Sequence, residues 1–177
     1  MKIFIWGMGL IGASLALALR RNGHEICGAV RSVKSREALK GMGFDRVTTD
    51  ESEALQMLRD CEMLALGLNV TDCFRIMDLV LADKALAKQL ILFDMCSTKV
   101  DICKYAERHS PAANFVGTHP MAGKEKQGPE AADAELFSGQ AVFITTLPGA
   151  ETAAEKVRDL WLSVNAVTCL LYTSRCV

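Results

Sequence analysis

The chain alternates short apolar runs with longer segments in which apolar residues recur every three or four positions. The first pattern is typical of strands buried on both faces, and the second of helices with one buried face. The expected strands lie at 2–6, 25–30, 62–68, 89–95, 114–120, 141–146 and 165–170, and the expected helices at 13–23, 35–43, 52–60, 72–88, 99–109 and 149–164.

This alternation predicts an α/β fold, with a doubly wound (Rossmann), mostly parallel sheet and helices on both faces. A mostly polar insert separates the expected strands at 114–120 and 141–146. Open sheets of this kind bind ligands beyond the carboxyl ends of their strands. Residues that directly follow a strand are therefore the first candidates for function.

The first 23 residues allow three interpretations. Lys2 is followed by seventeen residues without a charge, which is loosely typical of a secretory signal or a short membrane anchor. Three glycines interrupt this run, and it is too short to span a bilayer as a helix. A short apolar strand, then "GMGLIG", then a helix is the order that a dinucleotide-binding G-x-G-x-x-G turn needs, and we favour this interpretation.

The residues of this turn have distinct predicted roles. Gly7 permits the tight turn, Gly9 lets the backbone approach a pyrophosphate, and Gly12 lets the helix pack close to the strand. The helix that follows presents free backbone N–H groups and a partial positive charge to phosphates. We therefore expect the cofactor to be bound by Gly7, Gly9, Leu10, Ile11 and Gly12.

The end of the second expected strand bears on the choice of dinucleotide. An acidic residue usually stands there to hold the ribose 2′-hydroxyl of NAD, whereas this chain has Val30 and Arg31, followed by Ser32. A guanidinium can grip a 2′-phosphate in fork geometry. Arg31 and Ser32 are thus expected to bind the cofactor, with NADP preferred and NAD possible. The alternative is that Arg31 is a solvated loop residue.

Composition excludes several classes of protein. Of 177 residues, 50% are hydrophobic and 23% are charged, and the net charge is -1. This ordinary globular composition gives no reason to expect nucleic acid or a membrane as partner. The seven cysteines form no C-x-x-C pair, so we expect reduced thiols in the cytoplasm and no metal site.

Polar residues follow two further strands. Asp94, Ser97 and Lys99 lie in "FDMCSTK", and His119 lies in "GTHPMAG". At one edge of the sheet, Ser97 could orient His119, which could accept a proton from a hydroxyl as hydride leaves the same carbon. Alternatively Ser97 caps the next helix, and His119 lies in a simple turn. Lys99 is interpreted as a surface charge at the helix start.

The segments "GMGLIGASLA", "DMCSTK" and "THPMAGKEKQGPEAADAELF" resemble the prephenate/arogenate dehydrogenases of tyrosine biosynthesis. The resemblance implies NAD(P)-dependent oxidative decarboxylation of prephenate or arogenate. It implies that His119 accepts the ring hydroxyl proton, that Ser97 lies near His119 and the substrate, and that Glu125 shapes or gates the substrate side. Glu125 could instead belong to a surface ion pair. Asn69 stands where the family commonly has proline, so the loop expected near the nicotinamide departs from the family pattern at this residue.

The resemblance runs to about residue 168 and predicts a dinucleotide-binding domain at 1–168. Family members continue as a helical domain that supplies dimerisation and a cation for the substrate carboxylate, and that domain is expected to be absent here. Lys124 is then the only nearby candidate for that cation in this chain, with the alternative that it points to solvent. We expect the chain to be a fragment that is inactive alone, and the full-length protein to be a cytoplasmic homodimer.

The last residues suggest a different origin. Residues 169–174 are the residues that TGT CTC TTA TAC ACA TCT would encode, and this DNA matches one reading frame of a transposon end used in preparing sequencing libraries. We therefore expect 169–177 to be a non-native tail, with a natural edge strand as the alternative.

Two other functions stay open from the residues alone. One is a reductase of the same fold acting on a hydroxy acid or imine, and the other is a dinucleotide-binding module without catalysis. The segment "HPMAG" argues against the first. The residues do not decide between prephenate and arogenate.

Overall fold

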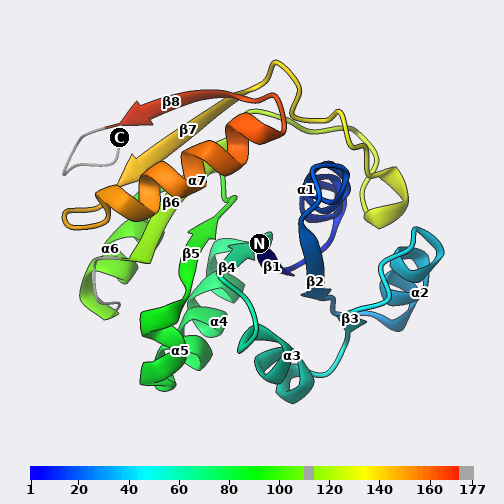
Figure 1. Ribbon diagram of the computed structural model, residues 1–177, viewed down its shortest axis with the longest axis horizontal. Coiled ribbons are helices and arrows are strands. Elements are labelled where there is room, and N and C mark those ends of the chain that lie inside the picture. Colours follow the sequence, from blue (N-terminus) through cyan, green and yellow to red (C-terminus); the bar gives the residue numbers. More distant parts are fainter. Residues whose placement is uncertain (110–113, 172–177) are drawn as a thin grey trace.

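A computed structural model describes residues 1–109 and 114–171, whose strands form one sheet in the order β3-β2-β1-β4-β5-β6-β7-β8 (Figure 1). The strands are β1 (Lys2–Trp6), β2 (Glu25–Ala29), β3 (Val47–Thr48), β4 (Met63–Leu66), β5 (Ile91–Asp94), β6 (Phe115–Pro120), β7 (Ala141–Thr146) and β8 (Val167–Leu171). The helices are α1 (Leu10–Arg21), α2 (Val33–Gly41), α3 (Glu51–Leu58), α4 (Val70–Ala82), α5 (Lys84–Gln89), α6 (Val100–His109) and α7 (Glu151–Ser163), with a 3-10 turn η2 (Pro129–Ala131).

Strand β1 shows why the sheet is covered on both faces. Ile3 and Ile5 lie in one hydrophobic core with α1 and α7, and Phe4 and Trp6 lie in the other with α3, α4 and α6. Successive side chains of a strand point to opposite faces, so an uninterrupted apolar strand needs two apolar coverings. The predicted doubly wound fold is confirmed (Figure 1).

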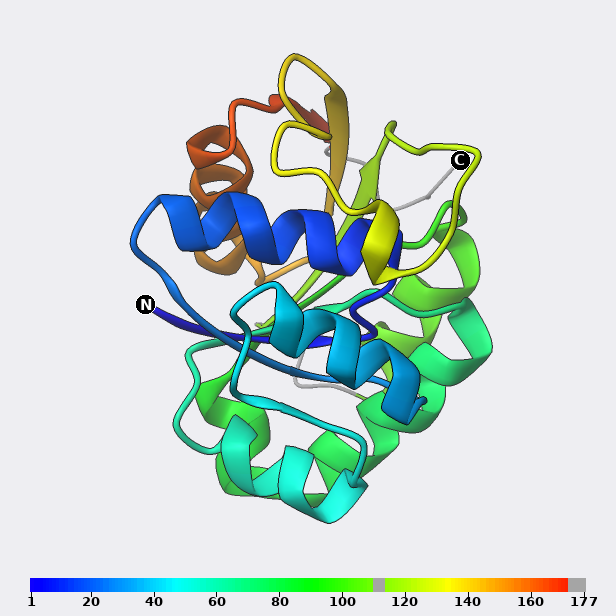
Figure 2. The same ribbon diagram turned by 90° about the vertical axis from the view of Figure 1, so that its right-hand side faces the viewer.

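All neighbouring strands are parallel except β6 and β7. Parallel neighbours need a crossover, whereas antiparallel neighbours can be joined at the edge where the first one ends. The polar insert 121–140 starts and finishes at that edge and runs beside α1, with η2 contacting both α1 and α2 (Figure 2). The insert therefore lies over the carboxyl ends of the strands.

The single helix expected at 72–88 is wrong, because the chain forms α4 and α5 with a break at Asp83. The Asp83 carboxylate accepts hydrogen bonds from the backbone N–H groups of Ala85 (3.0 Å) and Leu86 (3.2 Å) and pairs with Arg59 (2.7 Å). An N-terminal cap of this kind begins a new helix. The two-residue strand β3 and the turn η2 were not expected from the pattern.

The last described strand, β8, crosses the boundary expected after residue 168. It pairs with β7 through Leu171, so residues 169–171 belong to the sheet in this structure. Residues 172–177 of the expected tail lie outside the described residues, and the foreign origin of 169–177 stays a prediction. Within residues 1–109 and 114–171, no helix combines the length and apolar character needed to cross a bilayer.

Candidate functional site

The turn between β1 and α1 is built by close backbone contacts. Gly7 has φ +94°, and a Cβ there would lie 2.5 Å from the carbonyl oxygen of Gly67. A Cβ on Gly12 would lie 2.3 Å from the carbonyl oxygen of Gly7. Both positions therefore exclude a side chain, as the motif predicts. At Gly9 a Cβ would meet nothing within 4 Å, so the backbone there faces open space.

The first turn of α1 lies beside this open space. Gly9 is the N-cap residue, and no side chain of the described residues caps the helix. The free N–H groups belong to the first turn, which includes Leu10 and Ile11, and they have an unopposed partial positive charge. An anion such as a pyrophosphate fits this terminus, so the residues present suit a dinucleotide.

A hollow of about 530 Å³ extends from this turn. Its lining residues are Gly7, Met8, Gly9, Val30, Arg31, Ser32, Ser35, Gly67, Leu68, Asn69, Asp72, Gln127, Gly128 and Pro129. Three of them come from the insert, more than a hundred residues from the glycine turn in sequence. The sequence pattern carried no signal for that wall, because only the antiparallel return of the chain brings it here.

Arg31 is exposed and lines this hollow and a second one of about 230 Å³. In the described part of the chain it has no ion-pair partner. Ser32 is the N-cap of α2, with its hydroxyl accepting from Ser35 N–H (3.1 Å). The second hollow also contains Asp50 and Glu51, which the sequence analysis did not single out. Acidic groups thus reach this region from the start of α3 rather than from the end of β2.

Asn69 begins α4 by accepting a hydrogen bond from Asp72 N–H (2.9 Å). Asparagine is among the best N-cap residues. Asn69 therefore has a local structural role at the start of this helix.

The ends of β5 and β6 meet at a second corner. Ser97, Thr98, Lys99, Val100, His119, Phe143 and Leu171 line a hollow of about 310 Å³. The structure therefore brings Ser97 and His119 to the same hollow, as expected. Glu125 is exposed and lines none of these three hollows.

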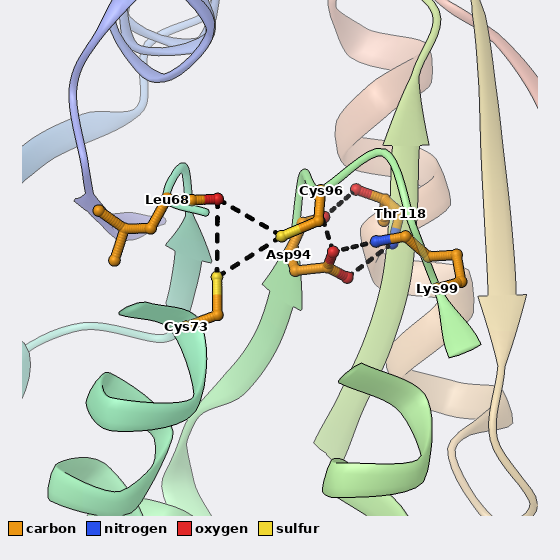
Figure 3. A network of polar contacts seen from close by, with 6 residues as sticks. All are labelled: Leu68, Cys73, Asp94, Cys96, Lys99 and Thr118. Carbon is orange, nitrogen blue, oxygen red and sulfur yellow. Dashed lines mark hydrogen bonds and ion pairs between the residues drawn. The ribbon is translucent and has the colours of Figure 1, made fainter. Parts of the chain in front are cut away.

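Lys99 is not the surface charge that was expected. Its side chain is only 8% exposed, and its ammonium forms an ion pair with the fully buried carboxylate of Asp94 (Figure 3). A buried ammonium needs such a partner, because removing it from water is costly. The signal in the sequence was Asp94 itself, an acidic residue that ends an apolar strand.

Burial and the ion pair shift the pKa values of His119 and of Asp94. Desolvation lowers the pKa of His119, and the Lys99 charge lowers it further, while Asp94 raises it in part. Burial raises the pKa of Asp94, and Lys99 opposes that change. Burial and Lys99 therefore both favour the uncharged imidazole, which is the form able to accept a proton.

Lys124 is not directed to this hollow. Its ammonium pairs with Asp133 (2.9 Å), whose backbone N–H donates to the buried hydroxyl of Ser14 (3.0 Å). The expectation that Lys124 is the only nearby cation is wrong, because Lys99 lines the hollow. Among the described residues, no three His, Cys, Asp or Glu side chains gather as metal ligands do.

Comparisons with known proteins point to one family. Residues 15–170 match the family model described as "Prephenate dehydrogenase, nucleotide-binding domain". The chain is 30% identical over 170 residues to a prephenate dehydrogenase of Bacillus subtilis (93% of this chain, 44% of that protein). It is 33% identical over 172 residues to a cyclohexadienyl dehydrogenase of Zymomonas mobilis (92% of this chain, 55% of that protein).

A solved structure resembles the whole described fold. It is a prephenate dehydrogenase from A. aeolicus in complex with hydroxyphenyl propionate and NAD+, with a TM-score of 0.82 and 26% identity over 97% of this chain and 59% of that one. The chain spans about half the length of the curated relatives it matches.

Gly9→Ala and Gly12→Ala distinguish the space left for a ligand at Gly9 from the close backbone packing at Gly12. Gly12→Ala is expected to lower the free energy of unfolding by about 1–3 kcal/mol, because its Cβ overlaps the Gly7 carbonyl. Gly9→Ala should leave stability within about 1 kcal/mol but weaken dinucleotide binding roughly tenfold or more, since its methyl group enters the open space. Urea unfolding and cofactor titration measure the two effects. An unchanged dinucleotide affinity in Gly9→Ala would contradict the assignment of the hollow beside the glycine turn to a dinucleotide.

Proposed function

This chain belongs to the prephenate dehydrogenase family, as its nucleotide-binding domain, and we propose that it serves the NAD(P)-dependent oxidative decarboxylation of prephenate or arogenate. The observation that carries this proposal is the placement of two complementary sites at the same edge of the sheet. One is the uncapped start of α1 for a dinucleotide, and the other is the hollow with His119, Lys99 and Ser97.

The proposed chemistry assigns a proton to this chain and a hydride to the cofactor. A dinucleotide held at the start of α1 would supply the nicotinamide as acceptor for the hydride from the ring carbon that carries the hydroxyl. A nitrogen of the neutral His119 imidazole accepts the hydroxyl proton as that hydride leaves. The bond to the opposite carboxylate then breaks, CO2 leaves, and the electron pair makes the ring aromatic. The phenolate oxygen takes the proton back from His119, so the charge balance is restored.

Ser97 and Lys99 support this step through their positions. Ser97 lines the same hollow as His119, where a hydroxyl can donate to or accept from the substrate oxygen. The Lys99 charge favours the uncharged imidazole and also an anionic oxygen beside it. Glu125 keeps a proposed role as a gate from the insert, and Leu10, Ile11 and Ser32 keep proposed roles beside the phosphates and ribose.

NADP is the proposed preferred cofactor. Arg31 supports this, because it is exposed between the two hollows and has no carboxylate partner among the described residues. The relative from A. aeolicus has NAD+ in its structure, and Asp50 stands near Arg31 here, so the preference needs a direct measurement. The homodimer and the cytoplasmic location stay predictions.

Arg31→Ala is expected to remove the preference for NADP. Loss of a charge-assisted phosphate contact should cost about 1.5–3 kcal/mol, or roughly ten- to hundredfold in NADP affinity, with little effect on NAD. Calorimetric titration of both cofactors measures it. Arg36→Ala is the matched control, since Arg36 pairs with Glu37 and lines neither hollow. Equal or tighter NAD binding by the unaltered chain would refute the preference.

His119→Asn, made in a full-length enzyme that carries this domain, is expected to retain cofactor binding and lose about 10² to 10⁴ in kcat. The unaltered enzyme should gain rate as pH rises through the imidazole pKa, because the neutral form is the acceptor. The midpoint of this rise in rate should lie below the ordinary imidazole pKa of 6.5, since burial and Lys99 both lower the pKa of His119. Exposed His109→Asn is the control. An active His119→Asn enzyme with an unchanged pH profile would contradict the role.

The 177-residue chain by itself is expected to bind dinucleotide without turning over prephenate or arogenate. The substrate carboxylates need cations, whereas Lys99 and Lys124 are both paired with carboxylates in the described structure. Fluorescence titration measures binding, and NADPH formation with each substrate measures turnover. A rate close to that of a full-length family enzyme would show that the site is complete within this chain.

A further inference from the structure

Asp94 is the last residue of β5, and its side chain is fully buried at the edge where the candidate site lies. A carboxylate in such a place needs several donors or a counter-ion to remain charged. The contacts around it therefore show what the charge is used for.

Three donors from two parts of the chain converge on this carboxylate (Figure 3). Cys96 N–H donates to Oδ2 at 2.9 Å, and Thr118 N–H donates to Oδ1 at 3.2 Å. The Lys99 ammonium also donates to Oδ2, and the Thr118 hydroxyl donates to the Asp94 backbone carbonyl. Asp94 thus holds the loop that leads to α6 and the residue of β6 immediately before His119.

We propose that Asp94 is a positioning residue that keeps the Lys99 ammonium beside His119 and so sets the charge that the imidazole experiences. This inference rests on the proposed role of His119 as proton acceptor, and the main effect of Asp94 on the imidazole is through the position of Lys99. Among the described residues, Asp94 is the one carboxylate that pairs with Lys99.

Without Asp94, Lys99 would be left as an unpaired ammonium in a buried place. An ammonium that is 8% exposed gains little from water, and breaking a buried pair by removing one member is strongly unfavourable. The lysine stem is flexible, so the charged group can leave for solvent when the carboxylate is lost. The position of the Lys99 ammonium therefore depends on Asp94.

The same carboxylate connects this corner to the dinucleotide hollow. Cys96 Sγ donates to the backbone carbonyl of Leu68 at 3.4 Å and lies 3.7 Å from Cys73 Sγ (Figure 3). Leu68 lines the hollow beside Gly7 and Gly9. The loop that carries Lys99 is thus held between the cofactor side and the proton-acceptor side of the edge.

The charges that act on His119 come from two groups with opposite effects. Lys99 lowers its pKa and Asp94 raises it, with the larger effect from Lys99. The neighbour on β7 is the uncharged Phe143, and in the insert Lys124 pairs with Asp133. Loss of Asp94 with Lys99 still in place would lower the pKa of His119, whereas departure of both charges would raise it. The direction in which the His119 pKa changes when Asp94 is lost therefore shows whether Lys99 stays beside the imidazole or leaves.

The test is a histidine titration by NMR on the 177-residue chain with Asp94→Asn, Lys99→Met and the double variant. The chain has three histidines, and His119→Asn identifies the signal by its loss. Asp94→Asn and Lys99→Met are each expected to raise the pKa of His119. The double variant is expected to match Asp94→Asn, because both charges are absent from beside His119 in each case. Asp83→Asn, which alters another carboxylate with two backbone donors and a paired cation, should leave it unchanged.

Several results would overturn the proposal. These are a lowered or unchanged His119 pKa in folded Asp94→Asn, or a His119 pKa in the double variant that lies above that of Lys99→Met. If Asp94→Asn alone does not fold by circular dichroism, Lys99→Met and the double variant decide. A double variant that also fails to fold, while Lys99→Met folds, would show that Asp94 acts on the sheet independently of Lys99. No readout requires turnover, so a wrong substrate for the proposed function would leave these outcomes unchanged.

Discussion

The burial of β1 on both faces is the constraint on which the other elements depend. Ile3 and Ile5 need one apolar covering, and Phe4 and Trp6 need another. Helices must therefore lie on both sides of the sheet, and chain segments must cross from one strand to a parallel neighbour. Parallel strands end at a common edge, so the glycine turn, the β5–α6 loop and His119 gather there without any direct sequence proximity.

Polar groups at this edge are bound in two different ways. The start of α1 keeps its backbone donors free, because Gly9 has no side chain to cap them. The opposite arrangement holds at Asp94, where every observed partner is a donor from the chain itself. Free donors suit a ligand that arrives and leaves, while satisfied ones suit a permanent charge that must stay in place.

The family and the glycine turn could be predicted from the sequence because their signals are local. A strand, a G-x-G-x-x-G turn and a helix are consecutive in the chain. Gly12 is required by a contact within this unit and Gly7 by a contact with the residues that follow β4, while Gly9 leaves open space. Helix boundaries were less predictable. The break at Asp83 depends on a cap that competes with a continuous apolar pattern, and that pattern alone favoured one helix.

The sequence by itself determined the fold class, the phosphate-binding turn and the candidate pair of Ser97 and His119, because periodicity and strand-end positions carry that information. Only the tertiary structure decided that Lys99 is buried against Asp94, that Lys124 turns to Asp133, and that the insert lines the dinucleotide hollow. Burial and ion pairing depend on which distant segments meet, and a residue type at one position does not specify its neighbours in space. From the sequence alone, Lys99 is predicted to be a solvated charge at a helix start. Its burial becomes clear only when Asp94, at the end of β5, is seen to lie against it.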